Sequence, residues 1–585
     1  MELLAGALSL AVLPVLVILA RWGANRWRYR RVPGPFAPPI IGNLPELRRH
    51  GSLHTYMDAC RRRYGRVFKA FNKWIDGLVE ASPQNGLMIY LGSKMFLFVA
   101  EPEGARKVMY KLINHNVGGM LTADRKAEFK ANTKGLFAAT GDDWRALRAA
   151  WQPAFSSSSL EQYARLMDGC ALELAASLGR AGEEGRAVDL WREVGKMTMS
   201  VVGTCAYGID FHTMDAPGRA SGAEGAQLVQ ASQRIFEAGL LSGSAWGRPL
   251  LLFPDAERVV AWLAARLPDQ ALVDVTQARK TIVNVSRGLI RSWRTARGGC
   301  SPAPSAAPAA AAAKPAPRAP PAAAPAAAAD APGRDQGGKR PGGATGIAPG
   351  SFLGLMLEGN GGGRGGFDDD TVIAQSNTFI LAGYETTANT LAYTLYAISA
   401  NPRVQERVLA EIDAFGRDRA PGHADVAGGA FPYLEATLKE SMRLFPAALM
   451  THRLVSRPEG FDVQLPGGGS VNVQHGDTIY TASYCYMRDE AYWPAPLEFR
   501  PERFLPEGSA LAPSLPLDHV FTPFGGGARL CIGYRFAKEE ALIALVRLYQ
   551  RFTFDLEPGV APLRMVHRLT LSPADGVRAR VVARA

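Results

Sequence analysis

One cysteine inside a glycine-rich loop constrains this chain more than any other feature. The segment from Phe524 to Gly533 reads FGGGARLCIG, with Cys531 near its end and Arg529 two residues earlier. Glycines let the backbone approach a flat, bulky group and aim N–H groups at a sulfur atom. The pattern predicts a cysteine thiolate that holds haem iron, with the Arg529 guanidinium at a haem propionate. The alternative is a surface turn with a chance cysteine.

The spacing Phe-x-x-Gly-x-x-x-Cys-x-Gly resembles the haem-binding signature of the cytochrome P450 family, the haem-thiolate monooxygenases. Phe524, Gly527, Cys531 and Gly533 fill its four fixed positions, and Ala528 replaces the proline that the family usually has before the arginine. The resemblance implies haem b as the cofactor and the cytochrome P450 fold, which is mainly α with small β-sheets in a single large haem domain. The same glycines match neither a dinucleotide-binding fingerprint nor a P-loop.

The composition agrees with one large catalytic domain. A chain of 585 residues, 47% of them hydrophobic, can bury a sizeable core. Its six cysteines are scattered without C-x-x-C pairs or zinc-like spacing, which argues against a disulfide framework or a zinc site. The net charge of +12 favours an anionic membrane surface or an acidic protein partner. Because the basic residues are dispersed beyond the N-terminus, we expect no nucleic-acid partner.

The N-terminus has the pattern of a membrane anchor. Residues 1–20 carry one charge, Glu2, and arginines mixed with Trp22, Trp27 and Tyr29 follow them. About twenty apolar residues span a bilayer, and the arginines should stay in the cytosol. We expect a transmembrane anchor at 1–20 and a basic, proline-rich hinge at 21–43, as in membrane-anchored microsomal members of the family. The alternative is a cleaved signal peptide. The resemblance implies a single-pass protein of the endoplasmic reticulum membrane, with its catalytic domain on the cytosolic face.

Residues 44–585 are predicted to form the haem-thiolate monooxygenase domain. Two apolar runs within 87–100 predict a β-hairpin around a Gly-Ser turn, and helical spacing recurs through 100–290. Residues 301–350 are almost pure Ala, Pro and Gly, a composition that cannot pack a core, so we expect a disordered loop there. A domain boundary is the alternative. We prefer the loop because family-like segments lie on both sides of it.

A long apolar segment, 368–402, predicts one buried helix with a six-residue motif in its middle. Residues 382–387 read AGYETT and match the family's oxygen-activation motif. Ala382 and Thr386 share a helix face against which a flat ligand could lie, and Gly383 removes bulk beside them. The resemblance implies that Glu385 and Thr386 are catalytic and manage protons. The alternative is structural: Thr386 bonds to the carbonyl one turn earlier and Glu385 caps a kink.

Three charged residues are expected to support the fold. Glu440 and Arg443 are three apart on a predicted helix and can pair, and Arg503 offers a second cation. They resemble the family's Glu-Arg-Arg lock, which we assign to folding and haem retention. An exposed pair of this kind would contribute under about 1 kcal/mol.

Three further residues are candidates for contact with the haem propionates. Trp144 and Arg148 are one helical turn apart and resemble a tryptophan-arginine pair of the family. Arg453 is the third candidate. For both arginines, an ordinary packing or surface role is the alternative.

The resemblance implies an oxidoreductase that inserts one oxygen atom from O2 into a lipophilic small molecule such as a fatty acid, sterol or terpenoid. The segments near 114–139 and 236–254 are expected to line its pocket, and they carry Leu121, Phe236, Leu241 and Phe253. The chain has no flavin or nicotinamide fingerprint, so the resemblance also implies a separate NADPH-cytochrome P450 reductase. Two alternatives stay open: a haem-thiolate isomerase or dehydratase, and a non-catalytic haem- or lipid-binding membrane protein.

Overall fold

The computed structural model of this chain describes residues 22–38, 43–71, 95–114, 134–211, 257–296, 351–357, 367–465, 468–567 and 569–584, with short stretches in 16–20 and 213–246. The predicted loop at 301–350 and nearly all of the predicted anchor at 1–20 lie outside these residues. Within them, every helix is too short or too polar to cross a membrane.

The described part is mostly helical with small sheets, as predicted. The helices that carry or surround the site are α4 (Pro102–Lys111), α7 (Gly141–Trp151), α8 (Ser157–Glu183), α9 (Leu190–Val202), α13 (Gln270–Ala296), α14 (Phe352–Leu357), α15 (Asp369–Ser399), α18 (Pro432–Leu444) and α21 (Tyr534–Tyr549). The others are α2 (Leu44–His50), α3 (Leu53–Tyr64), α12 (Glu257–Arg266), α16 (Pro402–Phe415), α17 (His423–Ala427), α19 (Ser483–Tyr486) and α20 (Leu517–Val520). Short helical segments of other types are η1 (Gln152–Phe155), η2 (Gly203–Tyr207), η3 (Pro501–Phe504), η4 (Pro506–Leu511) and η5 (Gly527–Arg529).

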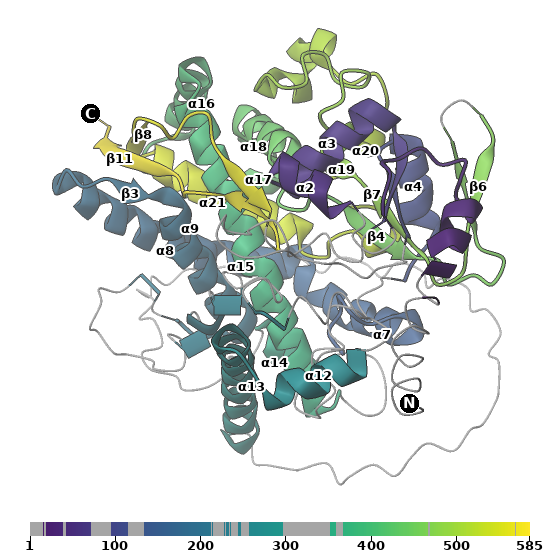
Figure 1. Ribbon diagram of the computed structural model, residues 1–585. Coiled ribbons are helices and arrows are strands. Elements are labelled where there is room, and N and C mark those ends of the chain that lie inside the picture. The colour runs from purple at the N-terminus through teal and green to yellow at the C-terminus, as the bar shows by residue number, and fades with distance from the viewer. Residues whose placement is uncertain are drawn as a thin grey trace, which may run out of the picture.

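Helix α15 runs through the middle of the molecule, with α8 and α9 on one side and the four-stranded sheet on the other (Figure 1). Asp368 caps its N-terminus by accepting from the Thr371 N–H at 2.8 Å, and Asp369 and Asp370 add negative charge to the first turn. Pro402 opens the next helix, where α15 cannot continue. The predicted long buried helix is therefore confirmed.

Four small sheets flank the helices. The largest has the order β1-β2-β7-β4, in which β2 and β7 are parallel and the outer pairs are antiparallel. The others are β3-β11-β8, β5-β6 and β9-β10. The strands are β1 (Val67–Phe71), β2 (Met95–Val99), β3 (Val188–Asp189), β4 (Thr451–Leu454), β5 (Phe461–Gln464), β6 (Ser470–Val473), β7 (Thr478–Thr481), β8 (Phe552–Leu556), β9 (Met565–His567), β10 (Leu571–Pro573) and β11 (Arg578–Ala583).

The predicted hairpin at 87–100 is found only in part. Its second run is β2, which pairs with β1 and β7. Its first run and its turn lie outside the described residues. The two strands that pair with β2 come from other segments of the chain, because sheet pairing depends on tertiary contacts that two neighbouring apolar runs do not reveal.

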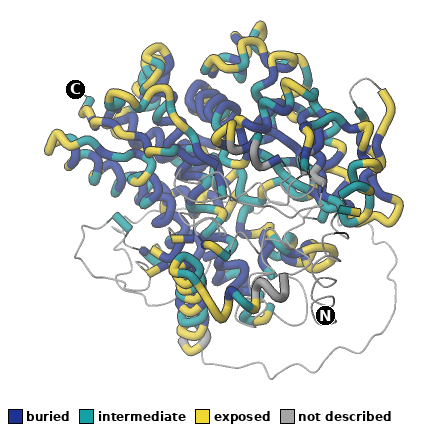
Figure 2. Tube along the Cα trace, in the orientation of Figure 1, coloured by how far each residue is buried: buried dark blue, intermediate teal, exposed yellow. Residues whose placement is uncertain are grey.

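Part of the predicted hinge packs against the domain. Residues 22–28 are helical and 33–38 are irregular, as the prolines require. Tyr29 and Val32 are buried with the strands of the largest sheet, and the Tyr29 hydroxyl donates to Asp477. Figure 2 shows buried positions concentrated along the central helices and exposed ones at the periphery.

Candidate functional site

Cys531 follows a tight turn that only glycine can form. Gly525 and Gly527 have φ values of +75° and +68°, in the region that favours glycine. A Cβ at Gly527 would lie 2.3 Å from the carbonyl oxygen of Met109 on α4. The Cys531 N–H donates to the Phe524 carbonyl at 3.0 Å and closes the loop. The glycines therefore let the loop pass directly over the backbone of α4.

The Cys531 thiol faces a space inside the protein. Its side chain is exposed, yet burial among protein atoms is the main influence on the thiol's pKa, which it raises. The accessible surface of the sulfur therefore lies within the fold. The Gly533 N–H and the positive charge of Arg148 act in the opposite direction and lower this pKa. The thiol also lies next to the N-terminus of α21, where the helix dipole favours a thiolate.

Three guanidinium groups, one buried and two partly buried, lie beside this loop and come from three separate elements. They belong to Arg148 of α7, Arg453 of β4 and Arg529 of η5. Burial, Arg453 and Arg148 together lower the pKa of Arg529 to about 9, and burial lowers the pKa of Arg453 to about 10. Among the described residues, their hydrogen-bond partners include the carbonyls of Leu530 for Arg148, of Leu112, His452 and Gly526 for Arg453, and of Ile113, Leu136 and Ala139 for Arg529.

These contacts orient the three arginines without neutralising them, because a carbonyl carries no net charge. The same positive charge acts on His452. Burial is the main cause that lowers the pKa of His452 to about 4, and the charges of Arg453 and Arg529 lower it further. An anionic group bound here would relieve the repulsion. Two carboxylates, such as the propionates of haem, therefore fit the charge of this cluster.

The aromatic residues of the two predicted motifs pack around the loop. Trp144 is buried, and the Arg529 guanidinium lies 4.3 Å from its ring centroid. The Phe524 ring is 6.2 Å from that of Tyr534 at the start of α21. A Cβ at Gly533 would meet only Phe155, at an ordinary 3.6 Å. Protein packing therefore does not demand glycine at position 533, unlike position 527.

The middle of α15 lies across an aromatic cluster from the cysteine loop. The Phe379 ring of α15 is 6.2 Å from Phe536 of α21, and Phe155 lies 6.3 Å from both. Ala382, one turn after Phe379, is exposed, whereas its neighbours on α15 are buried or only partly exposed. The rings of this cluster join α15 to α21. Ala382 on α15 and Cys531 just before α21 therefore both expose surface inside the fold. The exposed thiol, the opposing small residue and the arginines together fit a flat, anionic group such as haem.

The motif of α15 has a local structure that the sequence only partly predicts. The Thr386 hydroxyl donates to the Ala382 carbonyl at 2.7 Å, the bond of the structural alternative. Helix α15 is continuous through Glu385, so the carboxylate caps no kink. Glu385 is 4% exposed and accepts from Ser572 at 3.1 Å. Gly383 faces α9, where a Cβ would lie 2.9 Å from Val202. Its lack of a side chain therefore serves helix packing, which corrects the expected role beside a flat ligand.

Glu440, Arg443 and Arg503 lie together in the interior. Glu440 accepts from Arg443 Nε at 2.7 Å and Nη2 at 2.9 Å, and from Arg503 Nε at 3.0 Å. The backbone N–H of Arg500 donates to the same carboxylate at 2.9 Å. The three side chains are 0% exposed. These ion pairs tie α18 to η3, shortly before the cysteine loop.

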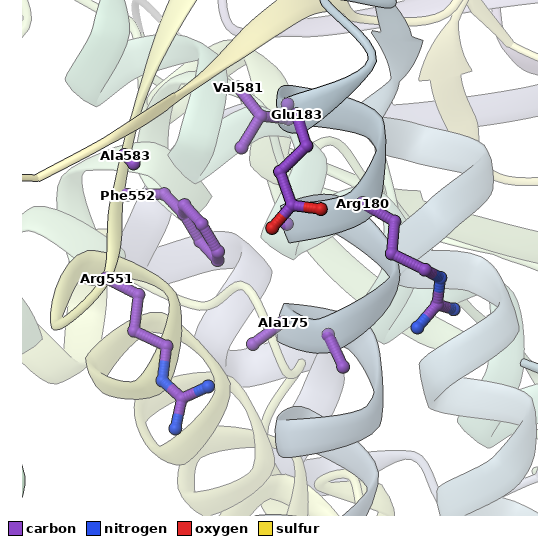
Figure 3. Close-up of a pocket in the computed structure, with 10 residues that line it drawn as sticks. Ala175, Arg180, Glu183, Arg551, Phe552, Val581 and Ala583 are labelled. Atoms are coloured by element: carbon purple, nitrogen blue, oxygen red, sulfur yellow. The ribbon is translucent and has the colours of Figure 1, made fainter.

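The expected pocket segments and one surface groove are not part of this site. Most of the segments 114–139 and 236–254 is outside the described residues. A surface groove of about 410 Å³ lies between α8 and the C-terminal strands. Figure 3 shows its walls: α8 contributes Ala175, Arg180 and Glu183, and Phe552, Val581 and Ala583 lie opposite. None of its lining residues was predicted as a site residue.

Sequence reasoning missed the partners of Glu385. Ser572 and Asn389 contact each other beside this acid, and Ser572 is 187 residues away from it. No spacing in the chain signals such a contact. Among the described residues, no group of three or more His, Cys, Asp or Glu side chains could hold a metal ion.

Comparisons with known proteins identify the family of this chain. The sequence profile of the family described as Cytochrome P450 matches residues 32–284 and 346–577. Cytochrome P450 3A5 of Homo sapiens is 24% identical over 97% of this chain and 95% of its own length. Lithocholate 6-beta-hydroxylase of Mesocricetus auratus is 24% identical over 98% of this chain and 96% of its own length. Cytochrome P450 3A11 of Mus musculus is 23% identical over 97% of this chain and 95% of its own length. The profile match spans well over half of the chain, which therefore belongs to the cytochrome P450 family of haem b-dependent monooxygenases.

Proposed function

We propose that Cys531 supplies the thiolate ligand of haem b and that Arg148, Arg453 and Arg529 hold its propionates. The observation that carries this proposal is the exposed thiol in an interior space, beside the buried guanidinium group of Arg453 and the partly buried ones of Arg148 and Arg529. Trp144 supports Arg529 from α7. Phe524, Gly527 and Gly533 shape the loop that presents the sulfur.

The test is the absorption spectrum of the reduced protein with carbon monoxide, for the wild type and for Cys531→Ser. Thiolate ligation by Cys531 predicts a strongly red-shifted Soret band in the wild type alone. An imidazole-like spectrum in the wild type, or a red-shifted band that survives in Cys531→Ser, would sink the assignment. Cys485→Ser is the matched control, because Cys485 is buried in another cluster.

Glu385 and Thr386 are proposed to manage protons. The chemistry that bound haem b supplies is O2 activation, in which one oxygen atom enters the substrate and the other leaves as water. This balance needs two electrons and two protons from outside the substrate. The Glu385 carboxylate holds a proton at its oxygens and Thr386 at Oγ1. Glu385→Gln and Thr386→Ala should each divert NADPH-derived electrons from product to hydrogen peroxide. Unchanged product per NADPH in both variants would contradict this role.

The substrate is proposed to be a lipophilic small molecule, and a steroid is the first class to test. A related chain of similar length carries the name Lithocholate 6-beta-hydroxylase. Binding of a steroid, a fatty acid or a terpenoid is measured by the change that it causes in the haem absorption spectrum. A response confined to fatty acids would argue against the steroid class.

The electron donor is proposed to be a separate NADPH-cytochrome P450 reductase that docks beside the cysteine loop. Exposed Lys107 and Lys111 of α4 and Arg535 of α21 lie on elements next to this loop. Opposite charges across such an interface speed association at low salt. Electron transfer should therefore slow as ionic strength rises, and a rate independent of salt would contradict the proposed docking surface.

The proposed location is the endoplasmic reticulum membrane, with residues 1–20 as a single-pass anchor, 21–43 as hinge and 44–585 as the cytosolic haem domain. The family profile matches on both sides of 285–345, which supports an inserted loop at about 301–350 within one domain. Membrane fractionation of the full chain and of a chain lacking residues 1–20 tests the anchor. Equal recovery of both in the soluble fraction would exclude it.

A further inference from the structure

Glu385 is held in place from the C-terminal end of the chain. Ser572, on β10, donates through Oγ to Glu385 Oε1 at 3.1 Å. Asn389, one turn after Glu385 on α15, donates through Nδ2 to Ser572 Oγ at 3.3 Å and to Thr570 Oγ1 at 2.9 Å. Ser572 and Asn389 are 0% exposed. The acid is therefore part of a buried hydrogen-bond chain that joins α15 to β10.

Which group donates and which accepts along this hydrogen-bond series follows from its first member. Trp191 Nε1, on α9, donates to Asn389 Oδ1 at 2.6 Å. An indole N–H can only donate, so the amide oxygen of Asn389 faces Trp191 and its NH2 group faces Ser572. The Ser572 oxygen then accepts from Asn389. Its hydrogen points to the carboxylate at 3.1 Å, which is nearer than the other hydroxyl in reach, Thr570 Oγ1 at 3.3 Å. Each group donates to the next, and the series ends at Glu385.

We propose that Ser572 is a positioning residue for Glu385, with Asn389 and Trp191 fixing the direction of its hydroxyl. This inference rests on the proposed role of Glu385 in handling protons. A donor on Oε1 restricts rotation of the carboxyl group and so fixes the direction in which its oxygens point. A buried carboxylate without such support would be costly. The C-terminal sheet thereby takes part in the chemistry of the central helix.

The test compares the full-length haem-loaded wild type with Ser572→Ala, Ser572→Thr and Ser376→Ala, using a reductase, NADPH and lithocholate as the probe. The ratio of product to hydrogen peroxide should fall about 10-fold in Ser572→Ala, because partners that orient a reactive group typically contribute at this scale. Ser572→Thr keeps the hydroxyl and should restore the ratio. Ser376→Ala is the matched control: it removes an equally buried hydroxyl of α15, one that donates to Tyr207 instead.

A second readout does not depend on turnover. Crystal structures of the wild type and Ser572→Ala should show the Glu385 carboxyl group in a different orientation in the variant, with an unchanged thiolate spectrum. The inference is wrong if Ser572→Ala keeps the wild-type orientation of this group. It is also wrong if Ser376→Ala loses as much product as Ser572→Ala, since the loss would then reflect packing in general.

Glu385→Gln separates this inference from the proposed function. If Glu385→Gln lowers the product-to-peroxide ratio and Ser572→Ala does not, Glu385 acts without Ser572, and only the positioning role fails. If Glu385→Gln leaves the ratio unchanged, the proposed proton role fails, and the inference falls with it.

Discussion

Replacing Glu440 by Gln should destabilise the protein far more than a surface ion pair would suggest. The Glu440 carboxylate accepts from two nitrogens of Arg443, one of Arg503 and the backbone N–H of Arg500, at 2.7 to 3.0 Å. Its removal leaves two guanidinium charges at 0% exposure without the carboxylate. Breaking a buried pair in this way costs about 3–5 kcal/mol. That is a large share of the roughly 5–15 kcal/mol by which folded proteins are stable.

The assay is urea denaturation of the haem-loaded protein, followed by circular dichroism and by the haem spectrum. Asp575→Asn is the matched control, because its carboxylate pairs with Arg564 at 68% and 74% exposure and should contribute under about 1 kcal/mol. The folded fraction of Glu440→Gln should turn over substrate at the wild-type rate per bound haem. A free energy of unfolding for Glu440→Gln that equals that of Asp575→Asn would refute the reasoning. The reasoning would also be refuted if Glu440→Gln lost turnover but kept the wild-type free energy of unfolding.

Three further predictions concern the core and the loop. Burial raises the carboxyl pKa of Glu540 well above its usual 4.5, so the native state keeps a proton that the unfolded state loses. Stability should then fall by up to about 1.4 kcal/mol per pH unit as pH rises above the unfolded pKa. Glu540→Gln should remove that slope in urea titrations at several pH values, and parallel curves would contradict it. Gly527→Ala should prevent haem loading, because its Cβ would strike the Met109 carbonyl at 2.3 Å. Gly559→Ala, at φ +87° with open space around it, should cost only about 1 kcal/mol; equal haem content in both would count against this account. Arg529→Gln should release haem about 10-fold faster or more to an excess of apomyoglobin, since a charged hydrogen bond contributes about 1.5–3 kcal/mol. Haem release from Arg529→Gln at the wild-type rate would contradict the role of Arg529.

The sequence was sufficient to place the helices with strong periodicity and clear end signals. Helix α15 begins within the acidic run, with Asp368 as its cap, and ends before Pro402, as predicted. The glycine loop around Cys531 was also predictable, because positive φ and close backbone approach leave few residue choices. Local chemistry controls both features, and a single sequence reports local chemistry well.

Partners that come from distant segments were not predictable. The sequence suggested one role for Gly383, beside a flat ligand, and packing against Val202 gives it another. Strand β2 pairs with β1 and β7, although two apolar runs around a Gly-Ser turn had suggested a hairpin. Arg453 donates to the carbonyl of its neighbour His452. The other carbonyl partners of Arg453 and Arg529 lie 73 to 416 residues away in the sequence.

The sequence by itself determined which chemical groups this protein carries: a loop cysteine, an acid beside a hydroxyl on a long helix, and several arginines at motif positions. Only the tertiary structure decided which of them meet. It gathers Arg148, Arg453 and Arg529 beside Cys531 and brings Ser572 to Glu385. The physical reason is that motif spacing reflects constraints within one helix or turn, whereas burial, charge repulsion and long-range hydrogen bonds depend on how the whole chain packs.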